Sequence, residues 1–208
     1  MSSSQGASPG PAALCALSVV CFTFFALLTG RVPHEAAPGL IAICFAGAVI
    51  QIIAAIMDLN HGDLVGGTTF FVFGGFFMLG TGINQTLHFV AAMTKTHFSP
   101  AMDGWFFLCL ALILIVLTPS FATISSIFFL ALLFADAAVL ILSLVNLKMI
   151  GPAFAPLAGW LILGIGLIGI YLVFAQVFNT AMGKMIFPLG SPLIKKHVPQ
   201  QGGLKADI

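Results

Sequence analysis

Residues 46–77 read AGAVIQIIAAIMDLNHGDLVGGTTFFVFGGFF. The end of one apolar run meets a short polar turn, Asp58–Asp63, and glycines separate five phenylalanines in the run that follows. Glycine destabilises a helix in water, but between membrane helices it lets two backbones approach closely. The stretch therefore predicts two membrane-spanning helices joined by a tight turn, and not the core of a soluble domain.

The composition of the whole chain points to the same class. Its 208 residues are 60% hydrophobic and 6% charged, and the mean hydropathy is +1.16. Because a soluble domain carries about 25% charged residues, this composition is typical of a polytopic helical membrane protein. The net charge of +1 argues against nucleic acid as a partner, since binding it requires a basic face.

Apolar runs of sufficient length predict six membrane spans, because a bilayer core requires about 20 apolar residues per helix. The expected spans are residues 12–30, 38–57, 64 to the low 90s, 104–117, 127–145 and 157–182. Pro11 suits a first helical turn, and Thr118-Pro119 is expected to end the fourth span. We therefore expect an all-α bundle over residues 11–183, between a disordered N-terminal tail at 1–10 and a C-terminal tail at 184–208.

Basic residues indicate how the bundle lies in the membrane. The first, third and fifth loops hold Arg31, Lys95 and Lys148. The C-terminal tail holds Lys184, Lys195, Lys196 and Lys205. An even number of spans puts both ends of the chain on one side, and basic residues favour the cytoplasm. We expect an integral protein of the cell membrane with both termini cytoplasmic.

Cysteine spacing and polar clusters give no sign of a metal site or an enzyme. The four cysteines lie in apolar runs without CxxC spacing and are interpreted as small hydrophobic side chains. His34-Glu35 and the turn Asp58–Asp63 do not reproduce a ligand spacing and are interpreted as solvated loop charges. Since the sequence also lacks a nucleophile elbow, a phosphate loop and a dinucleotide fingerprint, we expect no metal, no cofactor and no enzymatic activity.

Two groups of motifs carry a family resemblance. The first group is Gly47-Ala48-Val49-Ile50-Gln51, Asp58, Gly62, Gly66, Thr68 or Thr69, Phe70, Phe73 and Gly74, and the second is Gly159-Trp160, Ile170-Tyr171-Leu172, Asn179 and Phe187-Pro188-Leu189-Gly190. Together they resemble the acetate uptake transporter (AceTr, YaaH-type) family, whose bacterial members include the succinate–acetate/proton symporter. The chain resembles a divergent member, because Ser8–Leu14 stands for the family's NPxPLGL and Gln176 stands where a glutamate is common.

The resemblance implies a six-helix protomer that conducts acetate and similar small monocarboxylates, with succinate as a further substrate. It also implies a homohexamer with one pore inside each protomer. The narrowest part of that pore would lie at Leu17, Phe73 and Ala131, and Leu132 takes the last place after a one-residue slip in the alignment.

Polar side chains on the third span are candidates to line such a pore. At 100° per residue, Phe73, Phe77, Thr81, Asn84 and His88 fall within an arc of about 80°. Thr81 and Asn84 can donate hydrogen bonds to a carboxylate, and His88 can exchange a proton near neutral pH. An equal alternative is a hydrogen-bonding stripe that holds neighbouring helices together.

Four further polar residues lie inside the expected spans. Gln51 either lines a wet cavity or bonds a neighbouring helix, because a buried amide requires a partner. Gln176 and Asn179 either form a vestibule or cap the end of the sixth span. Asp136 is the one acidic residue in the middle of a span, where a charged carboxylate costs about 2.5–3.5 kcal/mol. It is interpreted either as a proton-coupling carboxylate or as a neutral acid bonded to a nearby group.

The sequence therefore predicts a channel or transporter for acetate and similar monocarboxylates, with or without a coupled proton. Two alternatives stay open. One is a pore for ammonia or another small neutral solute, since the expected pore has no ring of positive charge. The other is a non-conducting scaffold protein of the membrane.

Overall fold

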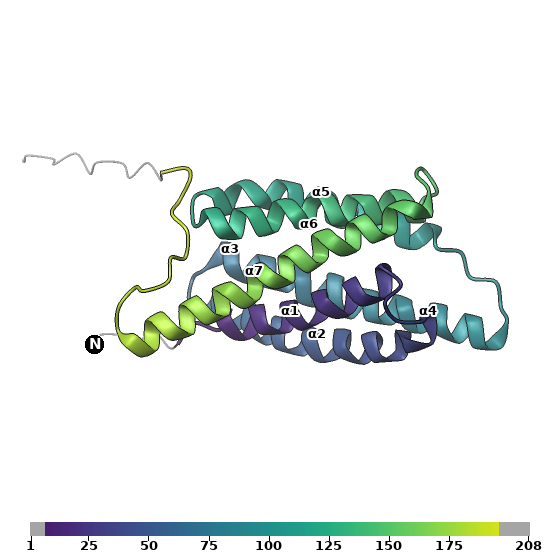
Figure 1. Cartoon of the computed structure of the whole chain (residues 1–208), viewed down its shortest axis with the longest axis horizontal. Coiled ribbons are helices and arrows are strands. Elements are labelled where there is room, and N and C mark those ends of the chain that lie inside the picture. The colour runs from purple at the N-terminus through teal and green to yellow at the C-terminus, as the bar shows by residue number, and fades with distance from the viewer. Residues whose placement is uncertain (1–6, 196–208) are drawn as a thin grey trace, which may run out of the picture.

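Helices make up nearly all of the computed structural model, which describes residues 7–195 (Figure 1). The long helices are α1 (Gly10–Leu28), α2 (Ala37–Asn60), α3 (Leu64–Val72), α4 (Thr81–Thr94), α5 (Ala101–Ala122), α6 (Ser126–Asn146) and α7 (Ala155–Met182). A π-helix, η2 (Phe73–Gly80), connects α3 to α4, and two single 3-10 turns, η1 (His34–Ala36) and η3 (Pro152–Phe154), precede α2 and α7. The expected disordered tail at 1–10 and the final part of the expected C-terminal tail lie largely outside the described residues.

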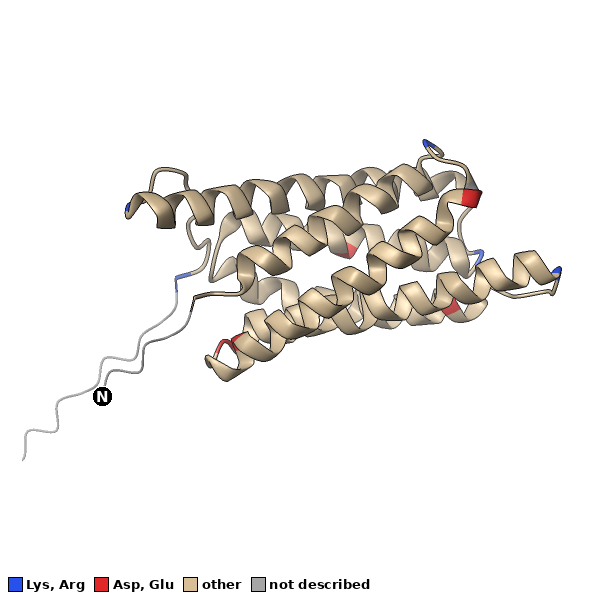
Figure 2. Cartoon of the chain, turned by 90° about the horizontal axis from the view of Figure 1, so that it is seen from below, with Lys and Arg blue, Asp and Glu red and all other residues tan. Residues whose placement is uncertain are grey.

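Within residues 7–195, six helices are long and apolar enough to cross a membrane, because α3, η2 and α4 form one continuous span, Leu64–Thr94. The predicted all-α bundle of six transmembrane helices is confirmed, and the chain is an integral membrane protein. Figure 2 shows that lysine and arginine lie at the two ends of the bundle, which leaves the helical shafts almost free of positive charge.

One predicted helix end is wrong. Thr118-Pro119 was expected to stop the fourth span, but α5 continues through Pro119 to Ala122. Proline removes one backbone hydrogen bond from a helix. Inside a membrane bundle neighbouring groups can satisfy the freed carbonyl, so a proline is tolerated there.

Consecutive spans run in opposite directions, so the bundle has two distinct ends (Figure 1). The terminal end is where α1 begins, α7 ends, and the turns α2–α3 and α5–α6 lie. The loop end carries the loops at residues 29–36, 95–100 and 147–154. Both ends of the described chain therefore lie at the terminal end of the bundle, as an even number of spans requires.

Close helix contacts inside the protomer use the glycines of α7. A Cβ at Gly166 would lie 3.0 Å from the Cβ of Cys21 on α1, and one at Gly164 would lie 2.7 Å from the ring of Phe134 on α6. Glycine allows α7 to approach both neighbours because it has no side chain to displace. These residues hold the protomer together and leave its outer surface to larger apolar side chains.

Candidate functional site

A cavity of about 350 Å³ opens at the terminal end of the bundle. We call it the vestibule. Its wall combines side chains from the start of α1, the end of α2, α3, the α5–α6 turn and α7. The polar members of the wall are Ser8, Asp58, Asp63, Thr69, Ser125 and Gln176.

A second cavity, of about 70 Å³, lies deeper in the bundle. We call it the inner cavity. Its exposed lining is apolar, and Thr81 is the one residue with a hydroxyl group among the described residues that surround it. The vestibule and the inner cavity share Leu17, Phe73 and Ile165 in their walls. These three side chains therefore form the partition between the two spaces.

The residues predicted to narrow the pore lie at this partition or beside it. Leu17 and Phe73 line both cavities, whereas Ala131 and Leu132 line the vestibule, where they are 8% and 6% exposed. Both members of the Ala131/Leu132 pair thus face the same space. Ile165 belongs to the partition too, and it could not be singled out from the sequence because it is one of several isoleucines in the apolar first half of α7.

The predicted polar ladder on the third span is divided by the structure. Phe73 and Phe77 stack with ring centroids 5.0 Å apart, and both line the inner cavity together with Thr81. Asn84 and His88 line neither cavity. The expectation assumed 100° per residue, but residues 73–80 form a π-helix, whose wider turns rotate each residue less. The phase of α4 is therefore different from that of an uninterrupted α-helix.

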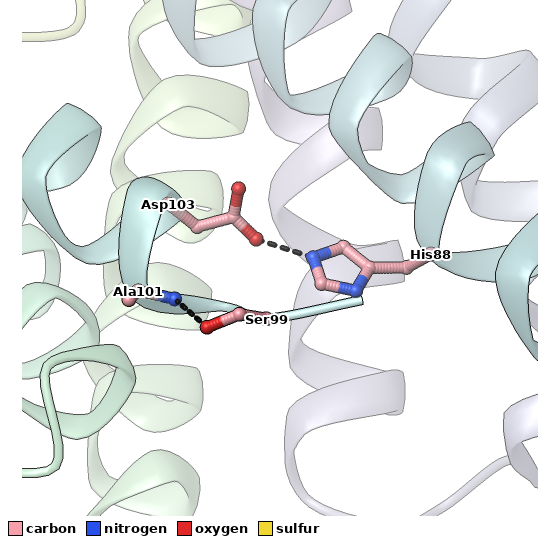
Figure 3. Close-up of polar contacts among 4 residues, drawn as sticks. All are labelled: His88, Ser99, Ala101 and Asp103. Carbon is pink, nitrogen blue, oxygen red and sulfur yellow. Dashed lines mark hydrogen bonds and ion pairs between the residues drawn. The ribbon is translucent and has the colours of Figure 1, made fainter. Parts of the chain in front are cut away.

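His88 pairs with a carboxylate on the neighbouring helix at the loop end. Its Nε2 contacts Asp103, which lies in the first turn of α5 and is 7% exposed (Figure 3). The edge of the imidazole also meets the ring of Phe98, with centroids 4.6 Å apart. His88 thus joins α4 to α5 and the loop between them.

Gln51 lies in a contact between helices. It is 0% exposed, and its Nε2 donates to the backbone carbonyl of Ala13 on α1 at 2.9 Å. The π-helix packs on it from the other side, since a Cβ at Gly74 would lie 2.8 Å from the Gln51 Cβ. Of the two interpretations of Gln51, the structure therefore favours the helix-bonding one.

Gln176 and Asn179 have different surroundings although they are one turn apart on α7. Gln176 lines the vestibule. The Asn179 side chain accepts from the backbone N–H groups of Ile186 and Phe187 at 2.8 and 2.9 Å, and donates to the Phe187 carbonyl at 2.7 Å. Asn179 therefore binds the segment that follows α7, part of which was expected to be a tail.

Asp136 lines neither cavity. It lies beside Thr118 of α5, and within the described part of the chain one of its carboxyl oxygens and the Thr118 hydroxyl are buried without a hydrogen-bond partner. Direct contact of this carboxylate with a solute in the vestibule is therefore not supported, and its position favours a helix-contact role.

The two acidic residues of the α2–α3 turn were both expected to be solvated charges, and this holds for one of them. Asp63 is exposed and caps α3 by accepting from the Gly66 N–H at 2.9 Å. The expectation of a solvated charge is wrong for Asp58, which is 7% exposed. Both carboxylates line the vestibule, because the short turn folds them back over the start of α3.

Comparison with known proteins gives a family and a similar fold. The model of the GPR1/FUN34/yaaH family matches residues 1–190. Among solved structures, the bacterial acetate channel SatP is similar with a TM-score of 0.78 at 19% sequence identity, over 89% of this chain and 99% of that chain. Comparison with the curated proteins gives no match. At this identity the structural likeness shows a shared fold.

Proposed function

The chain belongs to the GPR1/FUN34/yaaH family, as its motifs predicted, and from this membership we propose that it conducts acetate and similar small monocarboxylates across the cell membrane. One observation carries the proposal. Two cavities inside a single six-helix bundle share the side chains of Leu17, Phe73 and Ile165 in their walls. A scaffold protein has no need of such an interrupted path.

The apolar partition is proposed to be the gate. A hydrophobic constriction excludes water and so blocks ions until its side chains move. Phe73 contributes an aromatic ring to the partition, next to the aliphatic side chains of Leu17 and Ile165. It also begins the π-helix, where backbone hydrogen bonds span wider turns. Ala131 or Leu132 completes the narrow part from α6, on the vestibule side.

Two threonine hydroxyls support passage of a carboxylate. Thr69 in the vestibule is 5% exposed and Thr81 in the inner cavity is 2% exposed, and neither hydroxyl has a partner among the described residues. A buried hydroxyl without a partner costs free energy. A carboxylate oxygen can accept from each of them in turn, which lowers the cost of shedding water on both sides of Phe73. Gln176 is a further donor at the vestibule.

Other predicted polar residues have a supporting part in this proposal. Gln51 and Asn179 hold backbone segments in place, and Asn84 and His88 lie outside both cavities. His88 affects the pH dependence of flux through its pair with Asp103, because this pair holds α4 against α5. Asp136 is proposed to influence coupling only through its contact with α5.

The complete assembly is proposed to be a homohexamer with both termini cytoplasmic. The hexamer follows the family resemblance, and the exposed apolar side chains of the outer surface suit both lipid and neighbouring protomers. Lys184 and Lys195 lie at the terminal end and favour a cytoplasmic location for it. Native mass spectrometry and cysteine labelling at Ser3 and Lys205 test these two statements.

A pore for ammonia is a second candidate, and a specific observation favours it. Asp58 and Asp63 give the vestibule a negative charge, which disfavours a free anion and tolerates a neutral solute. An anion can pass only if a proton or a cation accompanies it, or if acetic acid crosses as the neutral molecule.

Purified protein in liposomes distinguishes these functions. Labelled acetate is expected to enter protein-containing liposomes faster than empty ones, and a coupled proton makes uptake respond to an imposed proton gradient. Succinate is tested in parallel. Ammonia conduction without acetate flux would replace the first proposal by the second, and flux of neither solute would favour the scaffold.

A further inference from the structure

A short segment after α7 crosses the terminal end of the bundle. Gly183 ends α7 with a φ of 63°, and the chain then runs from α7 to the turn between α5 and α6, as the yellow segment in Figure 1 shows. We call residues 186–194 the strap. It contains none of the long apolar runs that formed the basis for predicting spans, yet it is built into the protein at both of its ends.

The first half of the strap is bound to α7. Asn179 makes the three hydrogen bonds to Ile186 and Phe187 described above, and the Tyr171 hydroxyl donates to the Pro188 carbonyl at 2.7 Å. The ring of Phe187 packs against Phe174, with centroids 4.7 Å apart. Polar and apolar contacts therefore hold the same three-residue stretch.

The second half of the strap is bound to the α5–α6 turn. The Ser125 hydroxyl donates to the Leu189 carbonyl at 2.5 Å, and the backbone N–H of Ser126 donates to the Ser191 carbonyl at 3.0 Å. The N–H groups of Leu193 and Ile194 both donate to the Ala122 carbonyl, at 2.8 and 3.0 Å. That carbonyl belongs to the last residue of α5, so the strap satisfies a group that the helix itself leaves free.

Between these attachments the strap meets the vestibule. Leu189 and Gly190 are part of the vestibule wall, so the strap closes one side of the proposed substrate path. Gly190 has a φ of 83°, and a Cβ there would lie 2.7 Å from the Ser125 hydroxyl oxygen. No larger residue fits this contact, so the position next to Leu189 is determined by the backbone.

We propose that the strap is a fixed wall of the vestibule and that Leu189 sets the largest monocarboxylate that enters it. The inference rests on the proposed transport function. Polar groups gather on the α2–α3 side of the vestibule, at Asp58 and Asp63, whereas Leu189 presents a branched apolar side chain. Acetate carries a single methyl group beyond its carboxylate, whereas a longer alkyl chain has more apolar length to bring past the Leu189 side chain as it enters the vestibule.

Truncating the wall tests the size limit. Leu189→Ala is expected to raise the ratio of butyrate to acetate flux in liposomes by about tenfold, the effect of a small change in an apolar pocket. Leu193→Ala is the matched control, because Leu193 belongs to the strap but is 59% exposed and does not line the vestibule. An unchanged ratio in Leu189→Ala overturns the size-limiting role of this residue.

Releasing the strap tests the wall without any transport assay. Asn179→Leu removes three hydrogen bonds from the strap. It is expected to speed the modification of a cysteine placed at Gln176, in the vestibule wall, by a water-soluble thiol reagent. The measurement uses a background in which the exposed Cys15 and Cys109 are serine. Should Asn179→Leu not fold, Tyr171→Phe removes one bond and is expected to give a smaller increase.

The two readouts separate the two proposals. Absence of acetate flux in the unchanged protein contradicts the proposed function, and the labelling rate then still decides whether the strap covers the vestibule. Acetate flux together with unchanged labelling in both anchor variants contradicts the fixed wall.

Discussion

The two ends of the bundle are held together by different chemistry. At the terminal end, hydroxyl, amide and backbone groups bind the strap to α7 and to the α5–α6 turn, and none of these groups changes charge between pH 5 and 8. At the loop end, His88 pairs with Asp103 across α4 and α5. Histidine is the side chain whose charge normally changes in that range. Any response through the His88–Asp103 pair is therefore expected to reach the pore from the loop end, while the terminal end sets which solutes enter.

The loop end also has a pocket on its surface. A surface pocket of about 400 Å³ adjoins His88 and is lined by the loop residues Lys95, Thr96 and His97. Arg31, from the loop after α1, lies over the rings of Phe25 and Trp160 at 5.0 and 5.6 Å. Arg31 and Lys95 thus lie at this end, whereas the vestibule at the other end carries Asp58 and Asp63. A charge difference of this kind gives the two mouths of a pore different affinities for ions.

The largest expected effect comes from Phe73, because this side chain separates the two ends. Phe73→Ala is expected to raise acetate flux by about tenfold, which corresponds to about 1.4 kcal/mol of barrier. Liposome uptake measures it, with Phe76→Ala as the control, since Phe76 is 46% exposed on the outside of η2 and lines neither cavity. If both variants transport at the unchanged rate with equal protein incorporation, the gate lies elsewhere and the two ends are not joined at this point.

Gly190 tests how firmly the terminal end is closed. Gly190→Ala forces a Cβ against the Ser125 hydroxyl at a positive φ, and it is expected to lower stability by about 1–3 kcal/mol. Thermal unfolding in detergent measures this through the fluorescence of Trp105 and Trp160. Gly151→Ala is the control, because nothing lies within 4 Å of a Cβ there and its φ is −71°. Equal melting temperatures for the two variants would mean that the strap contributes nothing to the closure.

His88 tests whether the loop end responds to pH. His88→Gln keeps a polar side chain but cannot become charged. The change in flux between pH 5.5 and 7.5 is therefore expected to be about threefold smaller than in the unchanged protein. Asp103→Asn is expected to act in the same direction, because it removes the other half of the pair. His97→Gln is the control, since His97 lies exposed in the adjacent loop. If His97→Gln changed the pH dependence of flux and His88→Gln did not, the pH response would not arise from the α4–α5 contact.

The sequence predicted those parts of the molecule that depend on local patterns. Long apolar runs and the polar turn at Asp58–Asp63 define the spans, because the bilayer demands a minimum length of apolar helix. The phase of α4 could not be predicted in the same way. A π-helix follows from tertiary packing around Gly74 and Met78, and only the paired glycines in FGGFF indicate that the helix is weak there.

The partners of long-range hydrogen bonds could not be predicted from the sequence either. Gln51 bonds a carbonyl 38 residues away, and Ser125 bonds one 64 residues away, and a backbone carbonyl leaves no signature in the sequence. The motif Phe187-Pro188-Leu189-Gly190 was recognised by resemblance, but its position against the vestibule required the folded chain. Leu17 and Phe73 were identified by the same resemblance, and the structure places both at the partition between the cavities.

The smallest expected effect concerns Thr81, which lies on the loop side of the partition. Thr81→Val keeps the shape of the side chain and removes the hydroxyl from the wall of the inner cavity. If acetate crosses as the anion, flux is expected to fall by about threefold, because one hydrogen bond contributes about 0.5–1.5 kcal/mol. Asn84→Leu is the matched variant three residues further along, and it is expected to leave flux unchanged because Asn84 lines neither cavity.

The pH dependence of the Thr81→Val effect identifies the species that crosses. An anion needs the hydroxyl at every pH, so the threefold loss would be equal at pH 5 and pH 7. Neutral acetic acid needs little help in an apolar space, so its flux would follow the protonated fraction and the variant would lose nothing at pH 5. A loss caused by Asn84→Leu and not by Thr81→Val would contradict the position of the inner cavity on the path. The substrate would then pass along the α4 face on which Asn84 lies, and the two ends of the bundle would be joined by a different route.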